Sequence, residues 1–160
     1  MRKVFASILE ILEIAVVAIV AVFVIRSFLV QPFLVSGSSM VSTFENGDYL
    51  LIDELTYRFR APERGEVVVF KYPSDPSTYF IKRIIGLPNE RVVFGDGKII
   101  VFNSDKPSGF SLDETYLSQP FVPSEKREFD LAPSEYLVLG DNRSASFDSR
   151  SWGPLKKNMI

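Results

Sequence analysis

The first part of the chain is almost continuously hydrophobic, from Val4 to Val35. Its uncharged stretch, Ile14 to Ile25, would rise only about 18 Å as a helix, which is short of the roughly 30 Å hydrocarbon core of a bilayer. Extending the helix from about Ile11 to Leu29 reaches the required length and leaves charged residues near both ends, where they can reach head groups. The pattern therefore predicts one membrane-spanning helix, which Pro32 ends.

Positive charge flanks this helix mainly on its N-terminal side, where Arg2, Lys3 and the terminal amine lie, whereas Arg26 is the nearby cation on the other side. Positively charged flanks stay in the cytoplasm, so the rest of the chain is expected on the extracytoplasmic face of the cell membrane. A cleavable signal peptide is the alternative, but residues 26–31 offer no small-residue cleavage site. We therefore expect a permanent single-pass anchor.

After Gly47 the pattern changes to short runs rich in Val, Ile, Tyr and Phe, separated by Gly, Pro, Asp and Asn. This pattern is typical of β-strands, and the turn Gly95-Asp96-Gly97 should close a hairpin. Residues 103–126 are rich in Ser, Pro, Asp and Glu without periodicity, which predicts a surface insertion. The predicted strands are 49–54, 66–72, 79–85, 91–94, 98–102 and 128–139.

The predicted fold class is mainly β, with one N-terminal transmembrane helix followed by a curled, largely antiparallel β-sheet domain. Residues 1–31 would form the cytoplasmic N-terminus and anchor, and residues 32–160 the extracytoplasmic domain. A chain of 160 residues has room for one anchor and one compact domain.

Composition narrows the chemistry, because the chain contains no Cys and no His. Thiol nucleophiles, imidazole bases and Cys/His zinc sites are therefore excluded. Acid–base chemistry near neutral pH falls to Asp, Glu, Tyr or a lysine of lowered pKa. The formal net charge of -2, without a long basic run, gives no indication of nucleic-acid binding.

Three segments are candidates for that chemistry. Residues 36–44 read SGSSMVSTF, a stretch that by itself would be a flexible connector. Residues 79–88 read YFIKRIIGLP and place a lysine in a run typical of a buried strand. The alternative is an edge strand in which Lys82 and Arg83 point to solvent on alternate faces. Residues 140–153 read GDNRSASFDSRSWG, a polar loop that fits neither a calcium-loop nor a phosphate-loop spacing.

Together these segments resemble the signature boxes of the bacterial type I signal peptidases, also called leader peptidases: S-M-x-P-T, K-R-x-x-G-x-P and G-D-N-R-x-x-S-x-D-S-R-x-x-G. Residues 64–73 (RGEVVVFKYP) resemble the family's strand between the first two boxes. These enzymes are membrane-bound serine endopeptidases with a Ser/Lys dyad. They remove signal peptides from exported pre-proteins after small residues, at A-x-A-like sites. The resemblance implies the same activity, with signal peptides and the bilayer as partners and no cofactor or metal.

By this resemblance, Ser39 would be the nucleophile and Lys82 the general base. Ser146 would hold the Lys82 amine by a hydrogen bond, and Asp148 and Arg150 would form a supporting ion pair. Asp141, Asn142 and Arg143 are expected to be structural. The family's cleavage after small residues implies shallow apolar pockets, with substrate-binding candidates Phe33, Val35, Gly37, Phe44, Phe80 and Ile81.

Such a mechanism requires an unusual lysine. An ordinary lysine, with a pKa near 10.4, is neutral in only about one molecule in 2,500 at pH 7. Reaching a pKa near 7 takes about 4 kcal/mol against the charged form. Burial is expected to supply this, among apolar neighbours such as Phe80, Ile81, Ile84 and Phe147. The neutral amine would then accept the Ser39 proton, and water would later open the acyl-enzyme.

The chain departs from the family pattern in two places. Ser42 stands where the family usually carries Pro, and the sequence stops at Ile160, where relatives normally continue through another strand. A truncated sheet would favour the alternative of an inactive membrane-anchored relative that acts in binding or scaffolding. A cytoplasmic self-cleaving Ser/Lys repressor-type peptidase is a further alternative, but it would lack the anchor and carry a DNA-binding domain.

Overall fold

The computed structural model describes residues 2–28, 30–53, 55–95, 97–121 and 126–160. The chain forms two compact units. Met1–Phe33 and Tyr49–Arg60 make the first, and Leu34–Asp48 and Ala61–Ile160 make the second. This division differs from the predicted boundary after residue 31, because a later segment of the chain belongs with the N-terminal helix.

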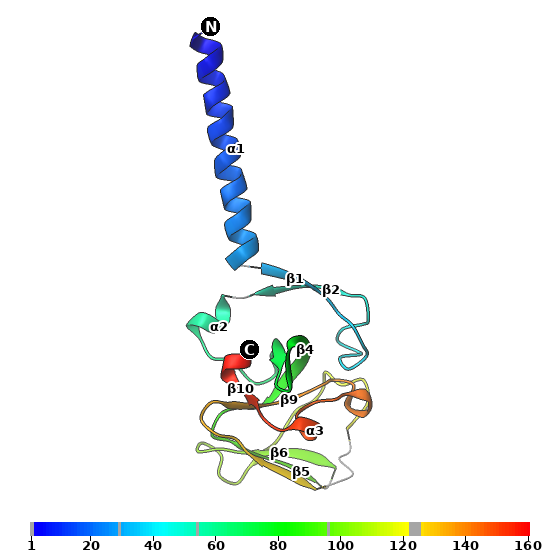
Figure 1. Cartoon of the computed structure of the whole chain (residues 1–160). Helices are drawn as coiled ribbons and strands as arrows, with labels where there is room; N and C mark the ends of the chain where they lie inside the picture. Colours follow the sequence, from blue (N-terminus) through cyan, green and yellow to red (C-terminus); the bar gives the residue numbers. More distant parts are fainter. Residues whose placement is uncertain (1, 29, 54, 96, 122–125) are drawn as a thin grey trace. The chain divides into compact units, whose positions relative to one another are not determined.

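The first unit contains helix α1 (Arg2–Phe28) and a two-stranded sheet of β1 (Val30–Leu34) and β2 (Tyr49–Asp53), followed by the short helix α2 (Thr56–Phe59) (Figure 1). Within α1, Phe5–Phe23 is long and apolar enough to cross a membrane. The helix ends before Pro32, but strand β1 was not predicted. Proline is compatible with β1 because a strand of a two-stranded sheet has an unpaired edge.

The second unit is built on two four-stranded sheets (Figure 1). One has the strand order β10-β9-β4-β3 and the other β7-β6-β5-β8. The strand pairs described in both sheets are antiparallel, as predicted. The strands are β3 (Val67–Tyr72), β4 (Asp75–Gly86), β5 (Arg91–Gly95), β6 (Lys98–Phe102), β7 (Phe110–Ser111), β8 (Arg127–Asp130), β9 (Glu135–Leu139) and β10 (Leu155–Lys156).

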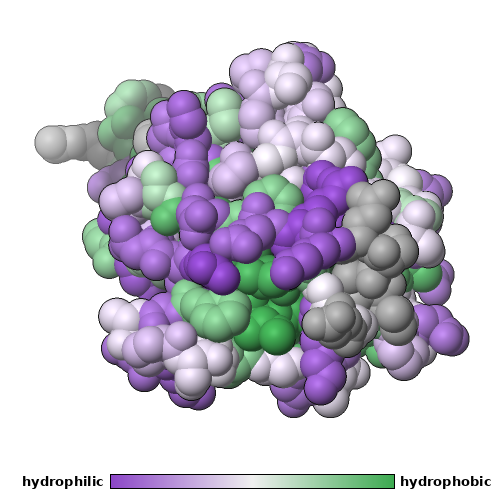
Figure 2. Space-filling view, turned by 90° about the horizontal axis from the view of Figure 1, so that it is seen from below, coloured by the Kyte–Doolittle hydropathy of each residue, from purple (hydrophilic) through white to green (hydrophobic). Residues whose placement is uncertain are grey.

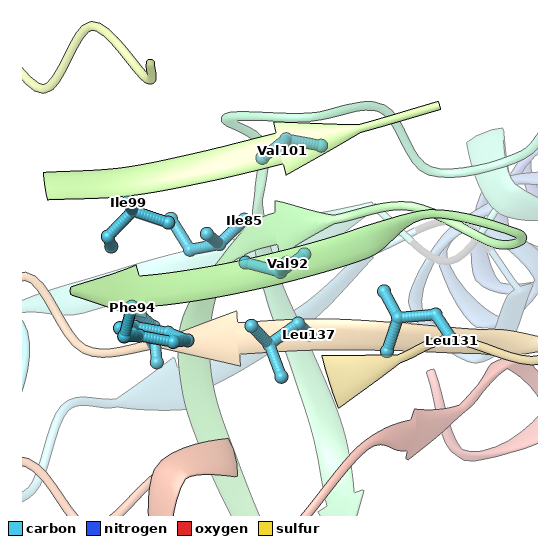
Figure 3. Packing of buried hydrophobic residues seen from close by; sticks show 8 residues of the cluster. Ile85, Val92, Phe94, Ile99, Val101, Leu131 and Leu137 are labelled. Carbon is cyan, nitrogen blue, oxygen red and sulfur yellow. The ribbon is translucent and has the colours of Figure 1, made fainter. Parts of the chain in front are cut away.

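The hydrophobic core of this unit is filled from both sheets, as Figure 3 shows. Alternate residues of each strand point into it, so that Val92 and Phe94 of β5 and Ile99 and Val101 of β6 are almost fully buried. Residues from β4 and β9 complete the cluster: Ile85, Leu137 and Leu139, with Leu131 beside them. On the face seen in Figure 2, hydrophilic residues predominate around a central hydrophobic area.

The predicted strand 128–139 is wrong as a single element, because the structure divides it into β8 and β9. Between them the Glu135 N–H donates to the Ala132 carbonyl at 3.0 Å, closing a tight turn with Pro133 at its second position, which proline favours. The two strands belong to different sheets. The predicted hairpin is present as the β5–β6 pair, in which Gly95 faces Lys98; Asp96 lies outside the described residues.

Segment 103–126 was predicted to be a surface insertion, and this is only partly correct. It contributes strand β7 to the second sheet, and Phe110, Leu112 and Phe121 pack against the core. Residues 122–125 lie outside the described part of the chain. The C-terminal region adds a turn of 3-10 helix, η1 (Arg143–Ala145), helix α3 (Ser149–Trp152) and η2 (Lys157–Met159).

Candidate active site

Ser39 lies in a loop, residues 35–48, whose two ends are joined to each other. The Val35 N–H donates to the Asp48 carbonyl, and the Gly47 N–H donates to the Val35 carbonyl, each at 2.9 Å. Just after Ser39, two backbone N–H groups donate to the carbonyl of Met40, whose side chain is only 1% exposed. The loop therefore has a closed base and a buried anchor beside the serine.

Lys82 lies on β4, which pairs with β3 on one side and with β9 on the other. The edge-strand alternative for this segment is therefore wrong. The Lys82 side chain is 4% exposed. Its Nζ lies 2.8 Å from Ser39 Oγ and 2.9 Å from the Ile81 carbonyl oxygen. The fold thus brings the two residues of the predicted dyad within hydrogen-bonding distance.

The surroundings of Lys82 make its charged form unfavourable. Burial lowers the pKa of the Lys82 amine from 10.5 to about 8, against the negative charge of Asp148, which raises it. At pH 7 roughly one molecule in ten then carries a neutral amine, whereas an amine of pKa 10.5 is neutral in about one molecule in 3,000. Lys82 can therefore accept a proton near neutral pH far more often than a surface lysine.

The polar loop after β9 holds the Ser39 backbone in place. The Asn142 N–H donates to the Ser39 carbonyl at 2.9 Å, and the Asn142 side-chain amide donates to the Ser38 carbonyl at 3.0 Å. Gly140 permits this approach, because a Cβ atom there would lie 2.5 Å from the Ser39 carbonyl oxygen and closer still to Ser146 Oγ. Sequence reasoning treated Asn142 as merely structural and missed its contact with loop 35–48, which carries the predicted nucleophile and is called the nucleophile loop below.

Asp148 and Arg150 form the predicted ion pair, in which both guanidinium contacts to the carboxylate are 2.8 Å. Asp148 is fully buried and also accepts the Gly140 N–H at 3.1 Å. Burial alone would raise the pKa of Asp148, but the hydrogen bonds and charge of Arg150, helped by Ser146 and Gly140, hold it below its ordinary value. Asp148 therefore stays ionised beside the lysine.

Ser146 has a buried hydroxyl that makes no well-formed hydrogen bond within the described residues. It lies near enough to Asp148 for its hydroxyl to help lower the pKa of that carboxyl by donating toward it. The expected hydrogen bond from Ser146 to the Lys82 amine is not among the contacts of the described residues.

A second buried ion pair joins the site from the opposite face of β4. Arg83 makes two contacts with Asp141, at 2.8 and 2.6 Å, and donates to the Gly65 carbonyl at 2.7 Å. Thr43, from the nucleophile loop, donates to the same Asp141 carboxylate at 2.5 Å. Arg83 and Asp141 thereby connect the lysine strand, the nucleophile loop and the loop after β9.

The predicted substrate-binding residues differ in their surroundings. Phe80 and Ile81 are next to the lysine: the Phe80 ring centroid is 5.2 Å from Lys82 Nζ, and the Ile81 carbonyl accepts its hydrogen bond. Val35 is only 7% exposed. Phe33 belongs to the first unit, Phe44 is half-buried, and Gly37 donates its N–H to Asn46 Oδ1 at 2.9 Å.

An aromatic cluster includes Phe80 and Phe147, which were expected beside Lys82, and also Tyr72 and Trp152, which were not. Tyr72 stacks on Phe80 with ring centroids 4.7 Å apart, and Phe147 and Trp152 lie edge-on to Tyr72 at 5.9 and 6.2 Å. Phe147 is 53% exposed. The alternation of β3 and β4 could have indicated that Tyr72 and Phe80 share a face, whereas Trp152, from the polar loop, carried no such signal.

The class of protein that the fold and site define is a mainly antiparallel β protein in which a serine hydroxyl is held against a buried lysine amine. The chain belongs to the signal peptidase family, peptidase S26, whose model matches residues 8–160.

The chain is similar to named members of this family. It is 41% identical over 135 residues to the probable signal peptidase I-2 of Synechocystis sp., and the match covers 81% of this chain and 58% of that protein. It is 32% identical over 165 residues to signal peptidase I of Pseudomonas fluorescens, covering 82% and 58%. The crystal structure of a signal peptidase I from Enterococcus faecalis matches with a TM-score of 0.52 and 27% identity, over 63% of this chain and 94% of that chain. This chain therefore spans less than two thirds of the first two relatives.

Proposed function

We propose that this protein is a membrane-anchored serine endopeptidase that removes N-terminal signal peptides from exported pre-proteins, cutting after small residues at A-x-A-like sites. Ser39 is the nucleophile and Lys82 is the general base. Membership of the signal peptidase family supports the reaction class. The observation that carries the mechanism is the 2.8 Å separation between Ser39 Oγ and the buried Lys82 Nζ.

Catalysis begins when the neutral Lys82 amine accepts the proton of the Ser39 hydroxyl. The serine oxygen bonds to the scissile carbonyl carbon; the carbon–nitrogen bond then breaks, and the proton passes from Lys82 to the leaving amine. The leader peptide is now held on Ser39 as an ester. A water molecule gives a proton to Lys82 and attacks this ester, the leader peptide departs, and the serine oxygen regains the proton. Lys82 ends the cycle neutral.

The negative charge that develops on the substrate oxygen requires hydrogen-bond donors already in place. The Ser39 N–H donates to no group within the described residues and is available as the first donor. The Gly37 N–H is engaged by the Asn46 side chain and does not serve as the second. The hydroxyls of Ser36 and Ser38, both on exposed residues of the same loop, are the candidates for that role.

Recognition of the substrate combines local apolar contacts with membrane attachment. Phe80 and Ile81 border Lys82 and would line a shallow site that admits only small side chains before the cut. Helix α1 would anchor the chain with its N-terminus in the cytoplasm, as the flanking charges predict, so that the catalytic domain is extracytoplasmic. Enzyme and leader peptide would then meet at one bilayer surface.

The test uses the full chain in detergent micelles and a synthetic precursor with an Ala-x-Ala junction. We expect Ser39→Ala and Lys82→Met each to lower kcat/KM by at least roughly 10³-fold. Two exposed residues provide matched controls: Ser42→Ala in the same loop and Lys71→Met on the adjacent strand β3 should stay within about threefold of the parent.

Undiminished turnover in either dyad variant contradicts the Ser39–Lys82 assignment. A parent chain that binds the precursor without cutting it would instead favour the alternative of an inactive binding or scaffolding relative. A precursor with Phe in place of the alanine before the cut tests specificity, and cleavage of both precursors at equal rates would contradict the small-residue site.

A further inference from the structure

Tyr116 lies in segment 103–126, outside the segments that carry the family resemblance. Its ring covers the guanidinium of Arg83, with 4.2 Å between Arg83 Cζ and the ring centroid. This is the shortest cation–ring distance among those in the described residues. A guanidinium this close to an aromatic face is attracted by it and loses part of its contact with water.

The hydroxyl of Tyr116 is held from the other side. It donates to Glu114 Oε1 at 3.1 Å, and it accepts a hydrogen bond from Arg143 Nη2, also at 3.1 Å. Arg143 is paired in turn with Glu114 at 2.5 Å. Burial raises the pKa of Tyr116 to about 12, so the hydroxyl remains protonated and can make both contacts at working pH. The ring is therefore fixed in its orientation over Arg83.

What Tyr116 covers is the ion pair that connects the parts of the site. Arg83 follows Lys82 on β4, and its partner Asp141 also accepts a hydrogen bond from Thr43 in the nucleophile loop. The Arg83 side chain is 11% exposed and that of Asp141 1%. Shielding from water strengthens such a pair, because charges interact more strongly where the effective dielectric constant is lower.

We propose that Tyr116 is a positioning residue for the Ser39–Lys82 pair. Its ring holds Arg83 in the two-point contact with Asp141, and this contact fixes the nucleophile loop, through Thr43, against the strand that carries Lys82. The inference rests on the proposed function for its kinetic consequences. It differs from ordinary core packing because the ring meets the ion pair rather than the apolar cluster formed by β4, β5, β6 and β9.

Three variants of the full chain in detergent micelles separate positioning from packing. Tyr116→Leu removes the aromatic face, and Tyr116→Phe keeps that face but removes the hydroxyl. Leu112→Ala is the matched control, because Leu112 lies in the same segment and packs against the core, whereas the hydrogen bonds of Arg83 in the described residues go to Asp141, Gly65 and Thr43. Unfolding temperatures are measured for all three, so that kinetic effects are compared at known losses of stability.

With the Ala-x-Ala precursor, we expect Tyr116→Leu to lower kcat by about tenfold while KM stays within about twofold, because a displaced dyad slows the reaction without removing a substrate contact. Tyr116→Phe should keep kcat within about threefold, and Leu112→Ala should keep both constants. Equal kcat values for Tyr116→Leu and Leu112→Ala would overturn the proposal. Equal losses in Tyr116→Leu and Tyr116→Phe would also overturn it, because the hydroxyl rather than the ring would then carry the effect.

A second measurement needs no substrate and separates failure of this inference from failure of the proposed function. The pKa of Lys82, followed by NMR titration of its side-chain amine, reports how well the site excludes water. We expect Tyr116→Leu to raise this pKa toward 10.5, and Leu112→Ala to leave it unchanged. A parent chain that cuts no precursor would refute the peptidase proposal, while an unchanged pKa in Tyr116→Leu would refute the positioning role.

Discussion

Asp148 acts on Lys82 in opposition to the effect of burial. Burial lowers the pKa of the Lys82 amine to about 8, and the negative charge of Asp148 keeps it from falling further. The carboxylate itself is held ionised by Arg150. The protonation of the proposed base is thus set by a balance between desolvation and one nearby charge, and this balance can be tested.

The first prediction concerns the pH dependence of the proposed peptidase activity in the parent chain. Since only the neutral amine accepts the serine proton, kcat/KM should rise with pH and level off above an apparent pKa of about 8. Initial rates on the synthetic precursor between pH 6 and pH 9.5 would measure this. The chain contains no histidine, so no histidine titration near pH 6.5 contributes to the dependence of kcat/KM on pH. A rate that does not change between pH 7 and pH 9 contradicts Lys82 as the base.

A second prediction follows for Asp148→Asn. The variant loses the negative charge beside Lys82 and keeps the positive charge of Arg150, and both effects should lower the pKa of Lys82. The rise of kcat/KM with pH, its acid limb, should therefore have its midpoint below pH 8. The maximal rate should also fall, because Asp148 accepts the Gly140 N–H and pairs with Arg150. Asp130→Asn, at an exposed position on β8, is the control and should leave the limb in place. A limb that moves to higher pH would contradict the stated balance.

The third prediction concerns the effect of the buried Lys82 amine on the free energy of unfolding. The unfolded chain binds the Lys82 proton with an ordinary pKa of 10.5, whereas the folded chain binds it with a pKa of about 8. Between these values the unfolded state carries more protons, so the contribution of Lys82 to the free energy of unfolding rises with pH. Lys82→Met should therefore be more stable than the parent at pH 7, by about 2 kcal/mol after loss of the amine hydrogen bonds.

Denaturant unfolding of the full chain in detergent, repeated from pH 7 to pH 10, measures this difference. The advantage of Lys82→Met should shrink as the pH rises. The control Lys71→Met, at an exposed position on β3, should show no such trend. If Lys82→Met is the less stable protein throughout this range, the buried amine stabilises the fold on balance, and the predicted sign is wrong.

The fourth prediction concerns Gly140→Ala. A methyl group there would meet Ser146 Oγ and would lie 2.5 Å from the Ser39 carbonyl oxygen, which belongs to the backbone and cannot rotate away. We expect the free energy of unfolding to fall by about 1 to 3 kcal/mol and kcat by about 10²-fold, because the proposed nucleophile would be displaced. In the control Gly95→Ala, the added atom has only an ordinary contact, 3.8 Å from Lys126, and both quantities should be nearly unchanged. Full activity of Gly140→Ala would contradict the close approach.

Much of the fold was predictable because its signals are local. The nearly continuous apolar run predicted the N-terminal helix, and alternating apolar residues predicted most strands within a few positions. The error at residues 128–139 has a physical cause, because a single Pro-containing turn separates two strands that join different sheets. Strand β1 was missed because its proline and preceding apolar run resembled the end of a helix.

The candidate site was predictable by residue type but not by contact. The motifs identified Ser39 and Lys82, and the fold brings these residues together across 43 positions of sequence. The contacts of Asn142 with the nucleophile loop and of Tyr116 with Arg83 depend on how distant segments pack. Such contacts leave no periodic pattern in the sequence, and they could be found only once the sheets were assembled.

The hydrogen bond from the Asn142 N–H to the Ser39 carbonyl has an evolutionary consequence. Because the serine is also secured by a main-chain donor in a different part of the protein, its placement does not depend on the bonds within its own loop alone. Natural variants are therefore expected to exchange Ser42 for the proline of the family pattern with little change in where the Ser39 oxygen lies. Insertions or deletions between β9 and Asn142 would displace the Asn142 N–H and with it Ser39. They should therefore be rare among active homologues.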